Sequence, residues 1–394
     1  MPEPTTAAHD PLAGFAVRMS LFYGASFLVI GLYLPYFPVW LHWRGLSSGE
    51  IGLIVALPSF ARIIGTPVAT LLADRIGDPR RMVRLLALYT LVCFALLPLA
   101  TTPQLILVLI LLYGLAGPSI LPLAEAVALS GVRTGGLDYG RMRLWGSVSF
   151  ILASALGGAA VKAFGPGIIQ WLIIGASLLT LTAAWSLPRA DVSPAANERE
   201  RGAGAGFGEA LQVLTTPSFA VFLLATALAQ SSHALFYAFG TLHWRSLGIS
   251  EAMIGLLWSV GVIAEILLFA WARRPLARLG PTGLIMLGAL AAVLRWSGMA
   301  FDPPLAVLFA LQALHGLSFG AAHLGAIHFM SAHVPARLSA TAQGLYSTAT
   351  VGIGMGTVLL ASGPLYDALG AKSYAVMAVL AIVGLSLSLG LFKR

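Results

Sequence analysis

Apolar residues occupy most of the chain in long runs, and only short polar or glycine-rich segments separate them. A helix needs about 20 apolar residues to cross the hydrocarbon core of a bilayer, which is about 30 Å thick. Lipid offers the backbone no hydrogen bonds, and no run alternates apolar and polar residues as a barrel strand would, so the runs predict helices. We expect twelve membrane-spanning helices, at residues 17–40, 51–72, 83–100, 104–130, 143–163, 167–187, 217–242, 253–272, 282–300, 304–331, 341–364 and 373–392.

The amino-acid composition agrees with this pattern. The 394 residues are 58% hydrophobic and 10% charged, with a mean hydropathy of +0.88, whereas soluble domains contain about 25% charged residues. We therefore expect an all-α integral membrane protein. The first apolar run is too long for a cleavable signal peptide and continues as a span. The single cysteine, Cys93, excludes an internal disulfide.

Lysine and arginine are distributed unevenly between the two ends of the predicted helices. With the N-terminus in the cytoplasm, seventeen of them fall on the cytoplasmic side, and four fall on the other side: Arg44, Lys162, Arg245 and Lys372. The positive-inside rule then places both termini in the cytoplasm. The net charge of +8 thus reflects topology and implies no nucleic-acid partner. We expect a multi-pass protein of a bacterial-type inner membrane that functions as a monomer.

The chain repeats itself. The segment "LHWRGLSSGEIGL" at 41–53 recurs as "LHWRSLGISEAMIGL" at 242–256, and "ADRIG" at 73–77 is echoed by "LARLG" at 276–280. A duplicated six-helix unit whose copies have the same orientation is typical of one large class of transporters. We expect an N-terminal six-helix bundle at 1–188, a cytoplasmic linker at 189–212 and a C-terminal six-helix bundle at 213–394.

The loop "LLADRIGDPRR" at 71–81 resembles the cytoplasmic signature of the major facilitator superfamily, which follows the second helix. The residues that match the signature are Asp74, Arg75, Gly77, Arg80 and Arg81. In one interpretation Asp74 pairs with a cation or a helix end in the inward-closed state, so that the loop is a gate. In the other, the loop is basic only because it sets the topology.

Two ionisable residues at matching positions of the repeat lie inside predicted spans. Arg62, in "LPSFARIIGTP", falls at the place of Glu265 when the repeat offset of 203 residues is applied. A lone charge at a helix centre costs about 2.5–3.5 kcal/mol on insertion scales, so such residues face the bundle interior and mark a pathway. A purely structural ion pair is the alternative.

Further buried charges resemble those of the lactose permease group of proton symporters. That group carries Glu, Arg, Glu, Arg and His in helices 4, 5, 8, 9 and 10, and the matching residues are Glu125, Arg143, Glu265, Arg295 and His323. The resemblance implies that the pair in helices 4 and 5 helps to hold the substrate and that the other three couple binding to a proton.

One carboxylate of that group, a turn after the histidine, is replaced here by Ala326. We therefore assign proton coupling to Glu265, His323 and Glu125, with Glu265 or His323 as the proton carrier. We interpret His315 and His328 as neutral histidines bonded to neighbouring helices, which is also the alternative for His323. No histidines show metal-ligand spacing, so we expect no metal site.

Polar and aromatic residues gather on the helices that line the cavity in this superfamily. Tyr33 and Tyr36 lie on one stripe of helix 1, and His233 and Tyr237 lie in a polar turn of helix 7. We predict that these four residues bind substrate together with Arg62, Arg143 and Arg295. For Arg62, the seam between the two halves is the alternative to the anion site. Aromatic rings with guanidinium groups suit an amphipathic carboxylate. The only asparagine, Asn197, is in the linker, which makes a sugar site less supported.

The segments "YGRMRLWGSVSFILAS" and "GPSILPLAEAVAL" resemble the phenylpropionate permease family. This resemblance implies proton-coupled import of a small aromatic acid, without a cofactor. One alternative is a drug/proton antiporter, although the Gly-Pro typical of helix 5 in antiporters occurs only at 165–166, past the helix. Others are a proton-coupled sugar or nucleoside symporter and a non-transporting receptor. A membrane-bound enzyme is not supported, because the sequence has no HExxH, GxSxG or Walker motif.

Overall fold

The computed structural model describes residues 11–188, 213, 215–272, 278–335 and 338–392, and within these ranges every regular element is a helix. They contain eleven helical stretches that are long and apolar enough to cross a bilayer. The last stretch, Ser339–Leu391, turns back at Gly370, which has a φ of 55°, and so makes two crossings. The twelve expected spans are therefore confirmed. The predicted linker at 189–212 lies outside the described residues.

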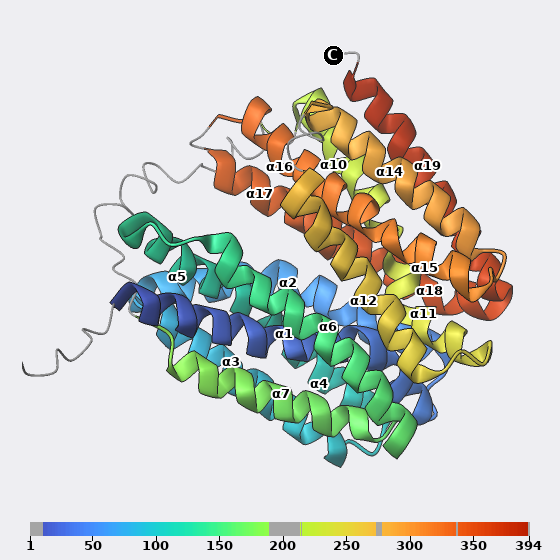
Figure 1. Cartoon of the computed structure of the whole chain (residues 1–394), viewed down its shortest axis with the longest axis horizontal. Coiled ribbons are helices and arrows are strands. Elements are labelled where there is room, and N and C mark those ends of the chain that lie inside the picture. Colours follow the sequence, from blue (N-terminus) through green and yellow to red (C-terminus); the bar gives the residue numbers. More distant parts are fainter. Residues whose placement is uncertain (1–10, 189–212, 214, 273–277, 336–337, 393–394) are drawn as a thin grey trace, which may run out of the picture.

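The first six crossings form one bundle (Figure 1). Its fourth crossing consists of two helices, α4 and α5, separated by a short 3₁₀ turn at Gly117–Ser119. The elements are α1 (Pro11–Trp43), α2 (Ser48–Ile76), α3 (Pro79–Leu96), α4 (Pro103–Ala116), α5 (Ile120–Gly135), α6 (Tyr139–Phe164) and α7 (Ile168–Trp185).

The last six crossings form a second bundle, and several of them are interrupted (Figure 1). Wide π-helical turns occur in three crossings, at η3 (Leu268–Ala272), η4 (Gly316–Ala321) and η6 (Thr348–Gly354). The α-helices are α10 (Pro217–Ser231), α11 (Ala234–Ser246), α12 (Glu251–Leu267), α14 (Gly280–Met299), α15 (Leu305–Ala313), α16 (Ala322–His333), α17 (Ser339–Ser347), α18 (Met355–Leu369) and α19 (Ser373–Phe392). π-Helical turns such as η3, η4 and η6 are frequent at functional sites.

Local sequence explains where the helices begin and end. Ser47 and Glu50 form a capping box at the start of α2, in which the backbone N–H of Ser47 donates to the Glu50 carboxylate over 2.8 Å. Gly77 ends α2 with a φ of 70°, a conformation that favours glycine. A polar cap at the start and a left-handed glycine at the end thus fix the length of this largely apolar helix.

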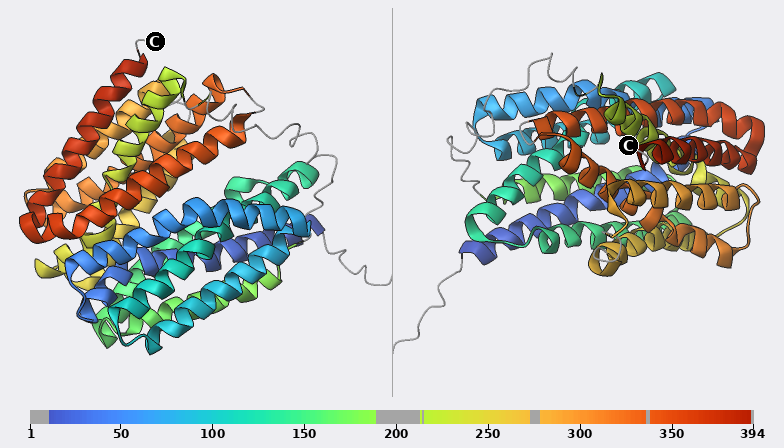
Figure 2. Two further views of the ribbon diagram at one scale, coloured as in Figure 1. Left: turned by 180° about the vertical axis from the view of Figure 1, so that it is seen from behind. Right: turned by 90° about the horizontal axis from the view of Figure 1, so that it is seen from above.

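The two bundles lie side by side and converge toward one end (Figures 1 and 2). We call the end at which α7 finishes and α10 begins the linker end, and the opposite end, with the α1–α2 and α11–α12 turns, the distal end. Close contacts join the bundles in the distal half. A Cβ atom on Gly255 of α12 would lie 2.4 Å from the carbonyl oxygen of Ser154 in α6, and one on Gly363 of α18 would lie 2.3 Å from that of Ser48. Glycines therefore allow the backbones to meet there.

Candidate functional site

A cavity of about 870 Å³ separates the two bundles. Asp138 and Arg141 line it at the start of α6, so its mouth is at the linker end, whereas the packed glycines close the distal end. One wall comes from α1, α5 and α6, and the other from α11, α12, η3, α14, α15, η4 and α16. The other polar and charged residues that line it are Glu125, Tyr139, Arg143, Ser147, Tyr237, Glu265, Arg295, Gln312, His315 and His323.

Arg143 is the cation of the N-terminal wall. Its guanidinium carbon lies 4.0 Å from the centre of the Phe27 ring, in a cation–π contact. Glu125 of the same bundle and Glu265 of the other bundle line the same cavity as Arg143. In the described part of the chain, no carboxylate forms an ion pair with Arg143. Glu125 instead accepts a hydrogen bond from the Tyr139 hydroxyl over 3.4 Å. The Arg143 guanidinium therefore remains available to an anion in the cavity.

Arg295 is the cation of the C-terminal wall, and only 1% of its surface is exposed. It donates to the Nδ1 atom of His315 over 2.9 Å and to the side-chain oxygen of Gln312 over 2.6 Å. The rings of Phe236 and Trp296 lie 4.9 Å and 4.5 Å from its guanidinium carbon. Because guanidinium only donates, Nδ1 of His315 carries no proton while this bond exists.

The π-helical turn η4 brings two histidines to the same cavity. Eight residues separate His315 from His323, which in a regular α-helix would rotate them apart by about 80°. The wider turn changes this phase, and both residues line the cavity. Phe319 stacks on both rings, with centroids 5.3 Å from His315 and 6.2 Å from His323. A Cβ atom on Gly320 would lie 3.4 Å from the Glu265 side chain, so this turn also supports Glu265.

A family model described as the MFS_1 like family matches residues 16–376. The chain belongs to this family. It is 32% identical over 369 residues to the probable 3-phenylpropionic acid transporter of Escherichia coli (strain K12), covering 92% of this chain and 94% of that protein. It is 30% identical over 379 residues to the maltose permease of Geobacillus stearothermophilus, covering 95% and 94%.

The crystal structure of a mutant of the nucleoside transporter NupG superposes with a TM-score of 0.85. It is 17% identical and covers 96% of this chain and all of that one, so it establishes the fold alone. The family consists of permeases of the major facilitator type, and the resemblance to that superfamily is confirmed. The protein is a multi-pass transporter of the inner membrane.

Four of the substrate residues predicted from sequence do not line the transporter's central cavity: Arg62, Tyr33, Tyr36 and His233. Arg62 lines a separate gap of about 340 Å³ between α2 and the segment formed by α17 and η6. Tyr33 packs inside the N-terminal bundle, stacked on Phe37 with ring centroids 4.6 Å apart. Tyr36 lies at the distal contact between bundles, where its hydroxyl donates to the Ser154 carbonyl over 2.5 Å. The spacing along helix 1 showed that Tyr33 and Tyr36 share one stripe of the helix, but it did not show whether this stripe faces the cavity.

The repeat relation between Arg62 and Glu265 also does not bring them together. Glu265 lines the central cavity, and Arg62 does not. The face of α1 that lines the cavity is instead apolar, formed by Phe27, Ile30 and Leu34. These residues gave no signal in the sequence because they look like ordinary membrane-facing residues.

The helix 7 residues are divided between the cavity and the layer behind it. Tyr237 lines the cavity, as predicted. His233 is fully buried behind the wall, in the turn between α10 and α11, with its Nε2 atom 3.1 Å from the Ser318 hydroxyl. Its ring centre lies 5.7 Å from that of His315. His233 therefore supports the wall without lining the cavity.

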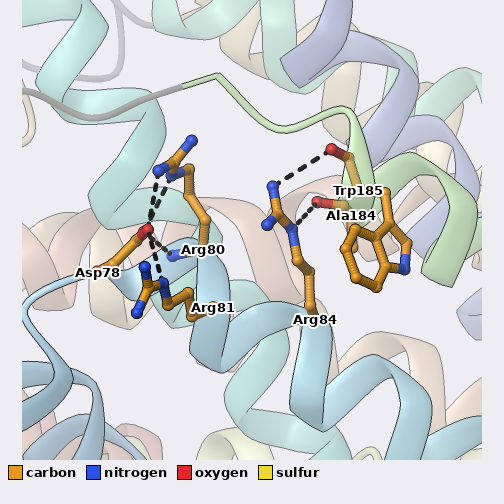
Figure 3. Close-up of polar contacts among 6 residues, drawn as sticks. All are labelled: Asp78, Arg80, Arg81, Arg84, Ala184 and Trp185. Carbon is orange, nitrogen blue, oxygen red and sulfur yellow. Dashed lines mark hydrogen bonds and ion pairs between the residues drawn. The ribbon is translucent and has the colours of Figure 1, made fainter.

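The loop between α2 and α3 has a different arrangement from the one expected (Figure 3). The Asp78 carboxylate accepts a hydrogen bond from the Arg80 backbone N–H over 3.0 Å and two from the Arg80 guanidinium, over 2.9 Å and 2.8 Å. The Nε atom of Arg81 lies 3.7 Å from the same carboxylate. Burial raises the pKa of Asp78, but the hydrogen bonds and charge of Arg80 outweigh this effect, so the pKa is lowered. The two arginines predicted to act with Asp74 and Arg75 thus pair with Asp78.

Arg84 joins this loop's helix to the end of α7 (Figure 3). It donates to the carbonyl oxygens of Ala184 and Trp185 over 3.2 Å and 3.3 Å, and its guanidinium lies over the Trp185 ring. Cations stabilise helix C-termini in this way. Sequence reasoning missed both Asp78 and Arg84, although an Asp before Pro79 is a recognisable helix N-cap signal.

Proposed function

We propose that the protein is a proton-coupled symporter that imports a small organic anion, an aromatic acid such as a phenylpropionate, by alternating access. The observation that carries the proposal is Arg143, a cation in the central cavity that has no carboxylate partner among the described residues and lies against an aromatic ring. The resemblance to the probable 3-phenylpropionic acid transporter supports the substrate class.

The cavity suits a molecule with one charged and one aromatic end. Arg143 offers a fork of N–H donors that matches a carboxylate. Across the cavity, Phe236 and Trp258 stack with ring centres 4.4 Å apart, and Tyr237 lies 6.2 Å from Trp258. A flat aromatic substrate gains burial and ring contacts on this second surface. A carboxylate bound to Arg143 then places its ring toward the C-terminal bundle.

Proton coupling in this proposal depends on Glu265. Glu265 belongs to the C-terminal bundle and lines the same cavity as Arg143 of the N-terminal bundle. A substrate anion that binds Arg143 reduces the effect of that positive charge on Glu265, and Glu265 then binds a proton more readily. Rocking of the bundles changes the distance between the two residues, which reverses the effect. One proton and one anion thus move together, with Glu125 and His323 as further protonatable groups in the same cavity.

The direction of opening follows from the distribution of arginine and lysine. The linker end carries the excess of positive charge and is assigned to the cytoplasm. The cavity has its mouth at that end, so the conformation corresponds to an inward-open state. The gap beside Arg62 lies between the bundles, and we assign Arg62 to the seam that closes when the cytoplasmic side closes.

A sugar or nucleoside symporter is the second candidate, because the maltose permease and the NupG transporter are related to this chain in sequence or fold. Such a polyhydroxylated substrate could bond to the Ser147, Tyr237 and Gln312 side chains of the cavity, but it carries no charge for Arg143, and the Gln312 side-chain oxygen already accepts from Arg295. A drug/proton antiporter remains the further alternative.

Uptake into proteoliposomes tests the proposal. The panel consists of labelled phenylpropionate, maltose and a nucleoside, each measured with and without an inward-directed proton gradient. We expect accumulation of the aromatic acid only with the gradient. Accumulation of the sugar or nucleoside alone, or outward drug transport, would replace the proposal by one of its alternatives.

A further inference from the structure

A polar cluster lies at the distal end of the C-terminal bundle, outside the central cavity. His243 in α11 is 6% exposed. Its Nε2 atom lies 2.6 Å from the carboxylate of Asp302, in the turn between α14 and α15, and its Nδ1 atom lies 3.0 Å from the hydroxyl of Tyr366 in α18. None of these three residues lines the central cavity. One imidazole therefore ties three elements together.

The two halves make this junction with different chemistry. Asp302 lies two residues before Pro304, the N-cap of α15, and Ala100 lies two residues before Thr102, the N-cap of α4, so they occupy the same place in the repeat. In the N-terminal half, Arg44 at the end of α1 donates to the Ala100 carbonyl. That junction has a permanent cation and a neutral acceptor, and its charge does not change with pH.

In the C-terminal half, the arginine that matches Arg44 does not take part in this junction. Arg245, the repeat counterpart of Arg44, pairs with Glu251 of α12 over 3.3 Å. A histidine and a carboxylate take over the junction. Imidazole side chains are the protein groups whose charge ordinarily changes between pH 5 and 8. Only the C-terminal junction of the pair therefore contains an imidazole, a group that gains a charge when it binds a proton.

The hydrogen bonds show what a proton would change. When His243 is neutral and Asp302 is ionised, Nε2–H donates to the carboxylate and the Tyr366 hydroxyl donates to Nδ1. A proton added to Nδ1 makes the imidazole a double donor. The contact with Asp302 then becomes an ion pair, and the Tyr366 hydroxyl must turn its hydrogen away and accept from Nδ1.

We propose that His243, Asp302 and Tyr366 form a proton-binding site at the distal end, separate from the central cavity, which holds α11 in its closed position when protonated. Asp302 gives access to it, because 43% of its side chain is exposed. Other titratable groups around His243 are Arg245 with Glu251, Tyr374 of α19 at a ring distance of 6.4 Å, and His42 in the cavity of about 520 Å³ that Tyr366 also lines.

The position of α11 explains why this site bears on the transport cycle. A turn at Ser232 and His233 separates α11 from α10, so the distal part of this crossing is a short helix of its own. Tyr366 lies one helical turn after Gly363 in α18, and Gly363 packs against Ser48 in the distal contact between the bundles. Charging His243 strengthens the bond that holds α11 to α15 and α18. Low pH on the distal side thus favours the closed distal end.

Spin-label distances in nanodiscs test this site without any substrate. We place labels at Trp43→Cys and Leu247→Cys, on exposed residues at the distal ends of α1 and α11, in a Cys93→Ser background. The chain also carries Glu265→Gln, so that the coupling residue of the proposed function does not contribute. The ratio of closed to open distal ends should rise about fivefold from pH 8 to pH 5.5, the difference between a neutral and a charged hydrogen bond.

His243→Gln should abolish this response, whereas His42→Gln, at the matching place in the other repeat, should retain it. Asp302→Asn keeps an acceptor for Nε2–H but removes the charge, so it should lose most of the response even where His243→Gln fails to fold. A pH response that persists in either His243→Gln or Asp302→Asn, or that is absent from the parent chain, overturns the site.

Discussion

Arg295 and His315 lie 2.9 Å apart in the wall of the central cavity, with the guanidinium donating to Nδ1 of the imidazole. This bond keeps Nδ1 free of a proton, so in this conformation His315 is a neutral member of the wall. A proton carrier must be sought among the other residues of the cavity, and Glu265 has no ion-pair partner among the described residues. Variants of His315 and Glu265 distinguish the roles of the two residues.

His315→Gln should retain proton-driven accumulation of substrate. A glutamine side-chain oxygen can accept from Arg295 in place of Nδ1, so the wall keeps its hydrogen bond while the titratable ring is removed. Uptake with and without a proton gradient measures the effect. Complete loss of gradient-driven uptake, with exchange intact, would make His315 the proton carrier.

Glu265→Gln should abolish accumulation driven by a proton gradient and retain exchange of substrate across the membrane. The amide preserves size and hydrogen bonding but cannot bind and release a proton. Counterflow of labelled substrate measures exchange in the same vesicles that fail to accumulate it. Full accumulation by this variant would exclude Glu265 as the coupling residue.

Arg143→Gln should weaken substrate binding by about 10- to 100-fold, since a hydrogen bond to a charged group contributes about 1.5–3 kcal/mol. Calorimetric binding of phenylpropionate by the purified protein measures this. Arg141→Gln is the matched control, because Arg141 lies at the mouth with 88% of its side chain exposed. Equal losses in both variants would indicate a general effect of positive charge instead of a binding contact.

Arg62→Ala should reduce transport much more than expression. Arg62 makes no ion pair with any described residue and faces Ser347 and Thr348 across the gap between the bundles. Closing this gap brings the guanidinium toward those hydroxyls, and Arg62→Lys should keep part of the activity. Protein yield and initial uptake rates check the two effects separately, and normal uptake by Arg62→Ala would leave the residue without a role in transport.

Asp78→Ala should lower the free energy of unfolding by about 1 kcal/mol, the usual cost of losing a helix N-cap. The pKa of Asp78 is lowered in the folded state, so its contribution is present above the unfolded pKa of about 3.9 and is lost as pH falls through the folded value. Thermal unfolding in detergent at pH 7 and in acid measures this difference. Asp78→Asn keeps the helix cap and loses the ion pair with Arg80, so its stability should lie between those of the parent protein and Asp78→Ala. Equal stability of all three proteins would contradict the role of Asp78 as a charged N-cap.

The sequence was sufficient to predict the twelve crossings, because their hydropathy is a local property of each run. The sequence also predicted that Glu125, Arg143, Glu265 and Arg295 face the interior, because buried charges in membrane helices do so. All four line the central cavity. The sequence was not sufficient for Tyr33 and Tyr36, because a stripe on a helix does not reveal which neighbour it meets, and it did not decide between the anion site and the seam for Arg62. The bond of His315 to a neighbouring helix is present as expected, to Arg295 of α14, but its position in the cavity lining beside His323 depends on the π turn at η4, which changes the helical phase. The contact between His243 and Asp302 joins residues 59 positions apart, which no local pattern indicates.

The glycine contacts at the distal end also allow the conformation of the protein to be changed by a single substitution. A methyl group at Gly255 would meet the Ser154 carbonyl at 2.4 Å, and neither backbone has a flexible side chain that can move aside. Gly255→Ala should therefore separate the bundles at the distal end and populate a conformation that is open there. Such a variant would be a starting point for trapping that conformation in crystals or on grids.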